Sequence, residues 1–296
     1  MSFFLHDIEP EPPAGTPVIG LQDRGFLLGD GVFDTAVAIA GPVFSAARHA
    51  ERLAQAGEAI GIACEAAAIL GKIEAMGDAC AGRDAILRTT LTRGIAARGL
   101  WPTEATTPTL VVTAQPWSRK LIGEPARLCL GRIPRNQRSP LASIKALAYL
   151  DNILAARQAS EEGCDDALIL NLHGRVACST IANVFALRDG TLVTPPTSEG
   201  CLPGILRRIV LEEAPGLGLT PIEAPLGVDE LMASEAGFLT NSVRLLRPVT
   251  AIGGTGLNRS ARLADLLDAV LARIAGDSGA RIARHEISPA FDRYLP

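Results

Sequence analysis

Leu141-Ala-Ser-Ile-Lys-Ala-Leu-Ala-Tyr-Leu-Asp-Asn152 is the stretch around which this chain is organised, and Lys145 lies within it. The chain has 28 lysine and arginine residues, of which only three are lysines. Lys72 and Lys120 lie in polar surroundings, whereas Lys145 has apolar neighbours. A desolvated lysine loses its proton more readily, so its amine becomes available as a nucleophile or Schiff-base former. The alternative, from these residues alone, is a structural lysine at the end of a buried helix.

The composition is that of an ordered globular protein with room for two domains. The chain has 296 residues, of which 48% are hydrophobic and 20% charged. Only 4% are aromatic, the net charge is −4 and no basic patch is continuous, so we expect no nucleic-acid partner. No apolar run reaches the length of a membrane span and no targeting signal is visible. We therefore expect no membrane partner and a cytoplasmic location.

The cysteines and histidines do not form a metal-binding or disulfide pattern. Six cysteines are scattered without a Cys-x-x-Cys pair, and none of the four histidines pairs at metal-ligand spacing. We therefore expect no metal site and no disulfide framework.

Two segments in the first half of the chain have the residue types of a ligand site. Residues 23–35 contain three glycines, which indicates tight turns or a close approach of the backbone to a ligand. A glycine-rich hairpin loop without chemistry is the alternative. In a helix predicted over residues 45–59, His49 and Arg52 lie one turn apart on the same face. An arginine held in this way can anchor a phosphate, although a solvated helix face would also explain the pair.

Two further segments point to bound anions. Arg93-Gly94 and Arg98-Gly99 follow a strand predicted over residues 84–92, where loop arginines indicate carboxylate binding. Gly204 precedes a helix predicted over residues 206–213, whose free backbone N–H groups could hold a phosphate.

The pattern of strands and helices predicts two domains. We expect an N-terminal α/β domain at residues 1–115, an inter-domain linker at 116–122, and a C-terminal domain at 123–296 that carries Lys145. Both domains mix helices and strands, which predicts the α/β (α+β) fold class.

Together these segments resemble the class IV (fold-type IV) family of pyridoxal-phosphate-dependent aminotransferases over about residues 21–252. The motifs that carry the resemblance occur in the family's order: Asp23-Arg-Gly-Phe with Gly29-Asp-Gly-Val-Phe33, His49-x-x-Arg-Leu53, Arg93-Gly94, Lys145 before Tyr149-Leu-x-Asn152, Asn183-Val-Phe185, Pro203-Gly-Ile205 and Thr240-Asn-Ser242. The resemblance implies two domains with pyridoxal 5′-phosphate in the cleft between them. It also implies an enzyme that forms a homodimer.

The same resemblance assigns roles to individual residues. Lys145 would be the catalytic residue, forming the Schiff base with the cofactor and moving the substrate proton. The cofactor phosphate would be held by Arg52, by the start of a helix at Gly204 and Ile205, and by the hydroxyl of Ser242. Four residues would contact the substrate: Thr35, Arg93, Arg98 and Asn241.

Within the family, the motif details favour aminodeoxychorismate lyase, which releases pyruvate and leaves 4-aminobenzoate. The double Arg-Gly step and the Thr240-Asn-Ser242 segment carry this preference. One alternative is an aminotransferase that acts on D-amino or branched-chain amino acids. Another is a homologue that binds the cofactor without turnover. The expected small-molecule partner is therefore an amino acid or aminodeoxychorismate.

Cys178 departs from the family pattern. The family has a glutamate five residues before the asparagine of Asn183-Val-Phe185, where its carboxylate keeps the cofactor ring nitrogen protonated. Here that cofactor-binding position is Cys178, and neither Ala177 nor Ser179 is acidic. A thiol is a weak donor that holds a protonated ring nitrogen less well. In one interpretation the nitrogen is mostly unprotonated, which suits an elimination. In the other, a thiolate forms and pairs with the protonated ring.

Overall fold

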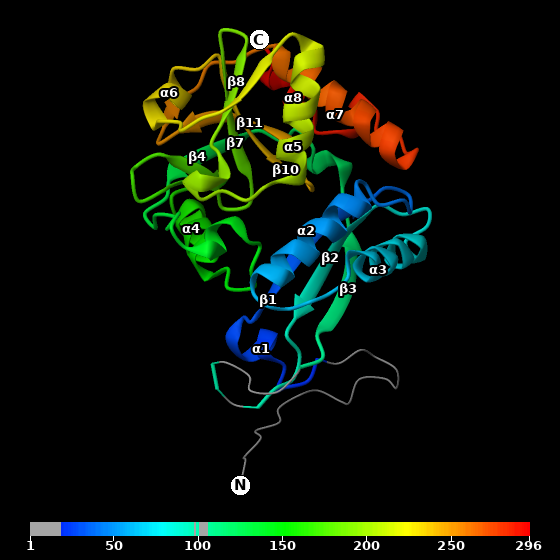
Figure 1. The fold of residues 1–296 in the computed structure, drawn as a ribbon. Helices are drawn as coiled ribbons and strands as arrows, with labels where there is room; N and C mark the ends of the chain where they lie inside the picture. Colours follow the sequence, from blue (N-terminus) through cyan, green and yellow to red (C-terminus); the bar gives the residue numbers. More distant parts are fainter. Residues whose placement is uncertain (1–18, 98, 101–105) are drawn as a thin grey trace.

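The computed structural model describes residues 19–97, 99–100 and 106–296 of the chain. These residues form a three-stranded and a nine-stranded β-sheet, each covered by helices (Figure 1). The expected mixture of helices and strands is confirmed. No helix in the described ranges has the length and apolar character needed to cross a bilayer.

The smaller sheet is antiparallel, and its strands follow the order β1-β2-β3. The strands of this sheet and the helices around it are α1 (Arg24–Leu28), β1 (Gly31–Ala38), α2 (Ala46–Ala59), α3 (Ala66–Ala79), β2 (Ala85–Thr92) and β3 (Thr109–Pro116). Helices α2 and α3 lie against this sheet in Figure 1, and apolar residues of both bury their side chains on it. Leu53, Ile69 and Ile73 meet Leu87 and Leu91 of β2 in this core, and together they exclude water from it.

The glycine-rich segment at residues 23–35 is not a hairpin loop. It forms the short helix α1, which ends at Gly29 in the left-handed conformation (φ 66°), and continues directly into β1. A Cβ added to Gly31 would lie 2.6 Å from the carbonyl oxygen of Leu91. This glycine therefore allows two strands of the sheet to approach each other, so the hairpin-loop alternative was wrong.

The larger sheet is mixed, with the strand order β6-β5-β4-β11-β10-β7-β8-β9 and with β12 paired to β11. The strands β4-β5, β4-β11 and β8-β9 pair in parallel, and the other pairs are antiparallel. Its strands are β4 (Ala126–Leu130), β5 (Asp166–Leu170), β6 (Val176–Ser179), β7 (Asn183–Arg188), β8 (Thr191–Thr194), β9 (Thr220–Glu223), β10 (Ala236–Asn241), β11 (Leu245–Ile252) and β12 (Thr255–Gly256).

The helices of this second unit cover its sheet on different sides (Figure 1). They are α4 (Leu150–Glu161), α5 (Ile205–Glu213), α6 (Val228–Met232), α7 (Arg262–Ser278) and α8 (Pro289–Tyr294). Buried side chains of α7 recur at intervals of three and four residues, as expected of a helix with one apolar face. They join a core with α5, α8 and the stacked rings of Phe185 and Phe238, whose centroids lie 4.9 Å apart.

The segment that contains Lys145 is extended and joins the two sheets. The N–H of Phe33 donates to the carbonyl of Lys145 at 2.9 Å, and the N–H of Leu147 donates to the carbonyl of Gly31 at 2.9 Å. Residues 144–147 therefore run beside the free edge of β1, and α4 begins only at Leu150. Lys145 lies between the 3-10 turn Pro140–Ser143 and α4 rather than at the end of a long buried helix, and its role stays a prediction. Between the sheets, residues 116–122 contain a single 3-10 turn, Arg119–Leu121, and the domain boundaries proposed above stay a prediction.

Candidate active site

A cavity of about 790 Å³ lies where the two sheets meet. Strands β1 and β2 contribute to one side of it, and β6, β10 and the start of α5 contribute to the other. Most of the residues predicted from the sequence line it: Thr35, Arg52, Lys145, Cys178, Gly204, Ile205, Asn241 and Ser242. The topology thus gathers residues that are up to 207 positions apart in the chain.

Lys145 points its amine at two aromatic rings. Its Nζ lies 4.3 Å from the centroid of Phe33 and 5.1 Å from that of Tyr149. Burial lowers the pKa of Lys145 from its ordinary value to about 8; Arg52 and Arg88 also lower this pKa, while Asp34 acts in the opposite direction. A substantial fraction of the amine is therefore uncharged near pH 8, the form that attacks a carbonyl carbon.

Arg52 is held by a buried carboxylate that the sequence did not single out. Asp34 accepts from Arg52 Nε and Nη2, both at 2.8 Å, and its Oδ1 lies 2.6 Å from His49 Nδ1. Burial alone would raise the pKa of Asp34, but Arg52 and His49 hold that pKa well below its ordinary value. The remaining nitrogen of Arg52, Nη1, lies 3.4 Å from the carbonyl oxygen of Pro203, next to the start of α5.

The residues at the start of α5 fit a phosphate group. Gly204 is the N-cap, and the first N–H groups of a helix have no acceptors within the helix. A Cβ on Gly204 would overlap Asn183 Oδ1, so only glycine allows the start of α5 to pack against Asn183. Thr240 Oγ1 lines the same cavity and is buried without a hydrogen-bond partner among the described residues, and Ser242 adds a second hydroxyl nearby. An anion seated here would supply the missing acceptors.

The two polar residues expected to contact substrate differ in their surroundings. Thr35 lines the cavity from β1. Asn241 also lines it, but its Oδ1 accepts from the backbone N–H groups of Val243 and Arg244 at 2.9 and 2.7 Å. Asn241 therefore shapes the turn after β10, and only its amide nitrogen, 3.4 Å from the carbonyl of Ile181, is left to face a ligand.

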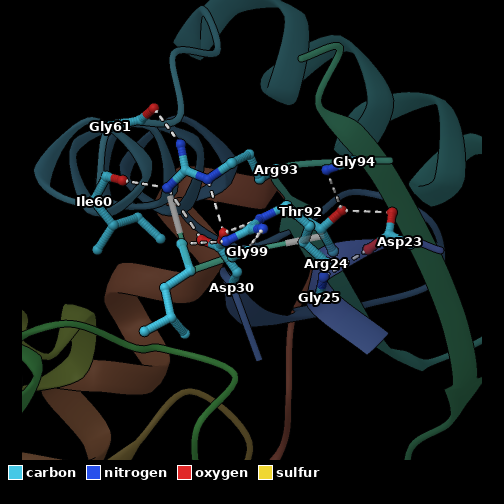
Figure 2. A network of polar contacts seen from close by, with 11 residues as sticks. Asp23, Arg24, Gly25, Asp30, Ile60, Gly61, Thr92, Arg93, Gly94 and Gly99 are labelled. Atoms are coloured by element: carbon cyan, nitrogen blue, oxygen red, sulfur yellow. Dashed lines mark hydrogen bonds and ion pairs between the residues drawn. The ribbon is translucent and has the colours of Figure 1, made fainter. Parts of the chain in front are cut away.

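Arg93 is not part of the cavity, which corrects the expectation that it binds substrate carboxylates. Figure 2 shows its guanidinium directed at Asp30 and at the carbonyl groups of Ile60 and Gly61. Arg93 Nε donates to Asp30 at 2.8 Å, while Nη1 and Nη2 donate to Gly61 and Ile60 at 2.8 and 2.6 Å. Arg93 thus ties the start of β1 to the end of α2. The other arginine of this expectation, Arg98, lies outside the described residues.

Arg88 is a cavity residue that the sequence reasoning missed. Its Cζ lies 3.7 Å from the centroid of the Phe33 ring, the same ring that Lys145 approaches. No carboxylate within the described part of the chain pairs with it, and burial lowers the pKa of its guanidinium. An arginine in the middle of the predicted strand 84–92 was a signal that could have identified it, because alternate residues of a strand face opposite sides.

Cys178 is accompanied by Arg135, a second cavity residue that the sequence reasoning missed. Arg135 Nη2 lies 3.7 Å from Cys178 Sγ and 3.1 Å from Asn152 Oδ1. Burial raises the pKa of the Cys178 thiol, and the charge of Arg135 opposes that effect. No spacing in the sequence indicated that Arg135 would reach Cys178 on a strand 43 positions away.

A partly buried lysine of lowered pKa that shares a cavity with a phosphate seat is the arrangement of a pyridoxal-phosphate enzyme. The sequence model of the family described as amino-transferase class IV matches residues 31–252. The chain therefore belongs to the class IV aminotransferase family, an enzyme family whose cofactor is pyridoxal 5′-phosphate. This confirms the family and the cofactor expected from the sequence motifs.

The relatives of this chain include both transferases and lyases. A putative branched-chain-amino-acid aminotransferase of Methanocaldococcus jannaschii is 32% identical over 250 residues, which cover 81% of this chain and 84% of that protein. Aminodeoxychorismate lyase of Bacillus subtilis is 30% identical over 243 residues, covering 79% and 82% of the two chains. Among solved structures, a putative 4-amino-4-deoxychorismate lyase of Legionella pneumophila is similar with a TM-score of 0.79 and 28% identity, covering 88% of this chain and 97% of that chain. The likeness in fold confirms the fold-type IV architecture.

Proposed function

We propose that this enzyme is a lyase that removes pyruvate from aminodeoxychorismate and leaves 4-aminobenzoate. The observation that carries the proposal is the thiol of Cys178, with Arg135 beside it, where the class IV pattern has a carboxylate. A transaminase must stabilise the negative charge that develops on the substrate carbon until a proton is added to the cofactor. An elimination instead discharges it by expelling a leaving group, so it depends less on a carboxylate at the ring nitrogen.

Lys145 is the residue that moves the proton in this reaction. When bound, pyridoxal phosphate binds the substrate amine and withdraws electrons from the carbon that carries it. The Nζ of Lys145, with its pKa lowered to about 8, is suited to take the proton from that carbon and to return a proton to the departing product. The rings of Phe33 and Tyr149 lie 4.3 and 5.1 Å from this amine and form its apolar surroundings.

The cations of the cavity divide between cofactor and substrate. Arg52, fixed by Asp34, and the start of α5 would hold the phosphate, with Ser242 as a further donor. Arg88 is a candidate for binding a substrate carboxylate, because no acidic side chain in the described ranges neutralises it; Arg135 and Arg244 line the same cavity. Aminodeoxychorismate carries carboxylates away from its amine, so its binding would place negative charge beside Arg88. Thr35 would orient the substrate from the same strand as Phe33.

An aminotransferase acting on D-amino or branched-chain amino acids is the second candidate. The similarity to the Methanocaldococcus jannaschii protein favours it, and so does an apolar part of the cavity wall formed by Ile86, Leu121, Leu141, Ile144 and Leu202. Such a wall suits an aliphatic side chain, whereas Arg88 suits a second carboxylate.

The experiment separates the two reactions. The purified enzyme with bound cofactor is mixed with aminodeoxychorismate, and pyruvate and 4-aminobenzoate are both quantified. In parallel, D-alanine, D-glutamate and L-leucine are tested for conversion to their keto acids. We expect equal amounts of pyruvate and 4-aminobenzoate, with little keto acid from the amino acids. Keto acid formation without 4-aminobenzoate would contradict the lyase and support the aminotransferase, and Lys145→Ala, which should abolish either reaction, is the control.

We also propose that the enzyme works as a homodimer. Helix α1 exposes Phe26, Leu27 and Leu28, and α4 exposes Leu150 and Ile153, with exposed fractions from 50% to 68%. The two helices adjoin, because Gly29 at the end of α1 packs against Ala148 just before α4. An apolar surface of this kind next to the cavity supports contact with a second copy. Sedimentation velocity should show a dimer, and Phe26→Glu should shift it toward the monomer; a monomeric wild-type protein would refute the proposal.

A further inference from the structure

Arg135 brings a positive charge to the end of the cavity at Cys178, and no carboxylate among the described residues forms an ion pair with it. Arg135 lies 3.7 Å from Cys178 Sγ through Nη2, and the same nitrogen donates to the neutral amide oxygen of Asn152 at 3.1 Å. Asn152 is itself fixed, because its Nδ2 donates to the carbonyl of Thr180 at 2.6 Å. Arg135 Nε is buried and finds no acceptor among the described residues. Arg135 is therefore held in place without being neutralised.

Asp166, the acid whose charge acts on Cys178, is engaged elsewhere, and Asp151, which also lines the cavity, is exposed. Asp166, buried on β5, accepts from the hydroxyls of Ser179 and Thr180 at 2.8 and 2.6 Å and from the N–H of Thr180 at 3.2 Å. Tyr149 and Cys201 also interact with Cys178; burial raises their pKa values to about 12 and about 11, so both are neutral at physiological pH. A ligand atom at this end of the cavity therefore meets a guanidinium and a thiol.

Both of these groups act as hydrogen-bond donors. A guanidinium has five N–H donors and no acceptor, and a protonated thiol is a weak donor. Burial raises the pKa of the Cys178 thiol, so the charge of Arg135 does not make the thiolate the dominant form. A ligand group that accepts a hydrogen bond is stabilised here. A ligand group that carries a proton and a positive charge is repelled, because the low local dielectric strengthens its repulsion from Arg135.

We propose that Arg135 and Cys178 hold the ring nitrogen of the bound cofactor in its unprotonated form. Cys178 occupies the position from which the class IV pattern directs a carboxylate at that nitrogen, and Arg135 adds a charge of the opposite sign to that carboxylate. An unprotonated ring is a weaker electron acceptor, which favours an elimination over a transamination. This consequence for catalysis rests on the proposed function. The sequence left two interpretations open, and the proposal favours the unprotonated ring nitrogen over a Cys178 thiolate paired with a protonated ring.

The test measures the protonation state of the nitrogen itself. The enzyme is loaded with pyridoxal phosphate that carries ¹⁵N in the ring, and its ¹⁵N NMR spectrum is recorded at neutral pH. An unprotonated pyridine nitrogen resonates far downfield of a protonated one. We expect the downfield signal in the wild-type enzyme and in Cys178→Ser, whose hydroxyl is also a neutral donor. We expect the upfield signal in Cys178→Glu, because its carboxylate would pair with Arg135 and with the ring proton.

The controls keep this inference separate from the proposed reaction. Arg132→Gln removes an arginine that is exposed and pairs with Glu162 at 2.7 Å, and it should leave the downfield signal unchanged. An upfield signal in the wild-type enzyme would overturn the inference, whatever reaction the enzyme catalyses. A downfield signal in Cys178→Glu would also overturn it, because Cys178 would then not determine the protonation state. A downfield wild-type signal in an enzyme that releases no 4-aminobenzoate would refute the proposed function alone.

Discussion

Replacing Lys145 with methionine should make the protein without cofactor more stable at neutral pH. Methionine retains most of the alkyl chain but has no charge to desolvate. The structure lowers the pKa of Lys145 from 10.5 to about 8, with burial as the main cause. At ~1.36 kcal/mol per pKa unit, this corresponds to roughly 3 kcal/mol of folding free energy that is lost whenever the lysine is charged.

The sign of the effect depends on pH. Because the folded-state pKa is below the unfolded-state value, the unfolded chain binds more protons between pH 8 and pH 10.5. The wild-type protein therefore gains stability as pH rises through this range. Lys145→Met should be more stable by up to roughly 3 kcal/mol at pH 7, and the difference should shrink toward zero as pH approaches 10.5.

Urea denaturation of the two proteins at a series of pH values measures this difference. Lys120→Met is the matched control, because Lys120 is exposed and its replacement should change the free energy of unfolding little at any pH. Equal stability of Lys145→Met and wild type at pH 7 would refute the reasoning. A stabilisation that stays constant up to pH 10.5 would also refute it, since packing rather than charge would then be responsible.

Two further substitutions test the anion seat and the corrected role of Arg93. Gly204→Ala forces a Cβ against Asn183 Oδ1 and should cost about 1–3 kcal/mol, with weaker cofactor binding by fluorescence titration. Gly216→Ala is its control, because nothing lies within 4 Å of the added Cβ; equal cofactor affinity in both variants would contradict the seat. Arg93→Gln should lower the free energy of unfolding by roughly 2–4 kcal/mol, because Asp30 and two backbone carbonyls lose donors. Its KM should stay at the wild-type value, and a large rise in KM with unchanged stability would restore the substrate-binding role.

Local patterns in the sequence were sufficient to predict elements that depend on residues close together in the chain. The predicted helix at residues 45–59 corresponds to α2 at Ala46–Ala59, and the predicted strand at 84–92 corresponds to β2 at Ala85–Thr92. Apolar periodicity alone determines such elements. The helical spacing also placed His49 and Arg52 on one face, and both reach Asp34.

Residues with the same local signature can have opposite roles, and only the fold distinguishes them. Arg88 lies within the strand predicted over residues 84–92, and Arg93 follows the end of that strand. Arg93 turns to Asp30 and two carbonyl groups, whereas Arg88 faces the cavity over Phe33. The difference arises from where Asp30 lies after folding, and no spacing along the chain records that position.

The Lys145 segment shows the same division. Its residues by themselves indicated an amine in apolar surroundings, and the ordered motifs along the chain were sufficient to identify the family and its cofactor. The tertiary structure decided that this segment runs beside the edge of β1, which brings the amine against the contacting rings of Phe33 and Tyr149. It also placed Arg135 Nη2 3.7 Å from Cys178 Sγ. Desolvation and charge pairing act over distances of a few ångströms in space, so they are determined only when strands distant in sequence are brought together.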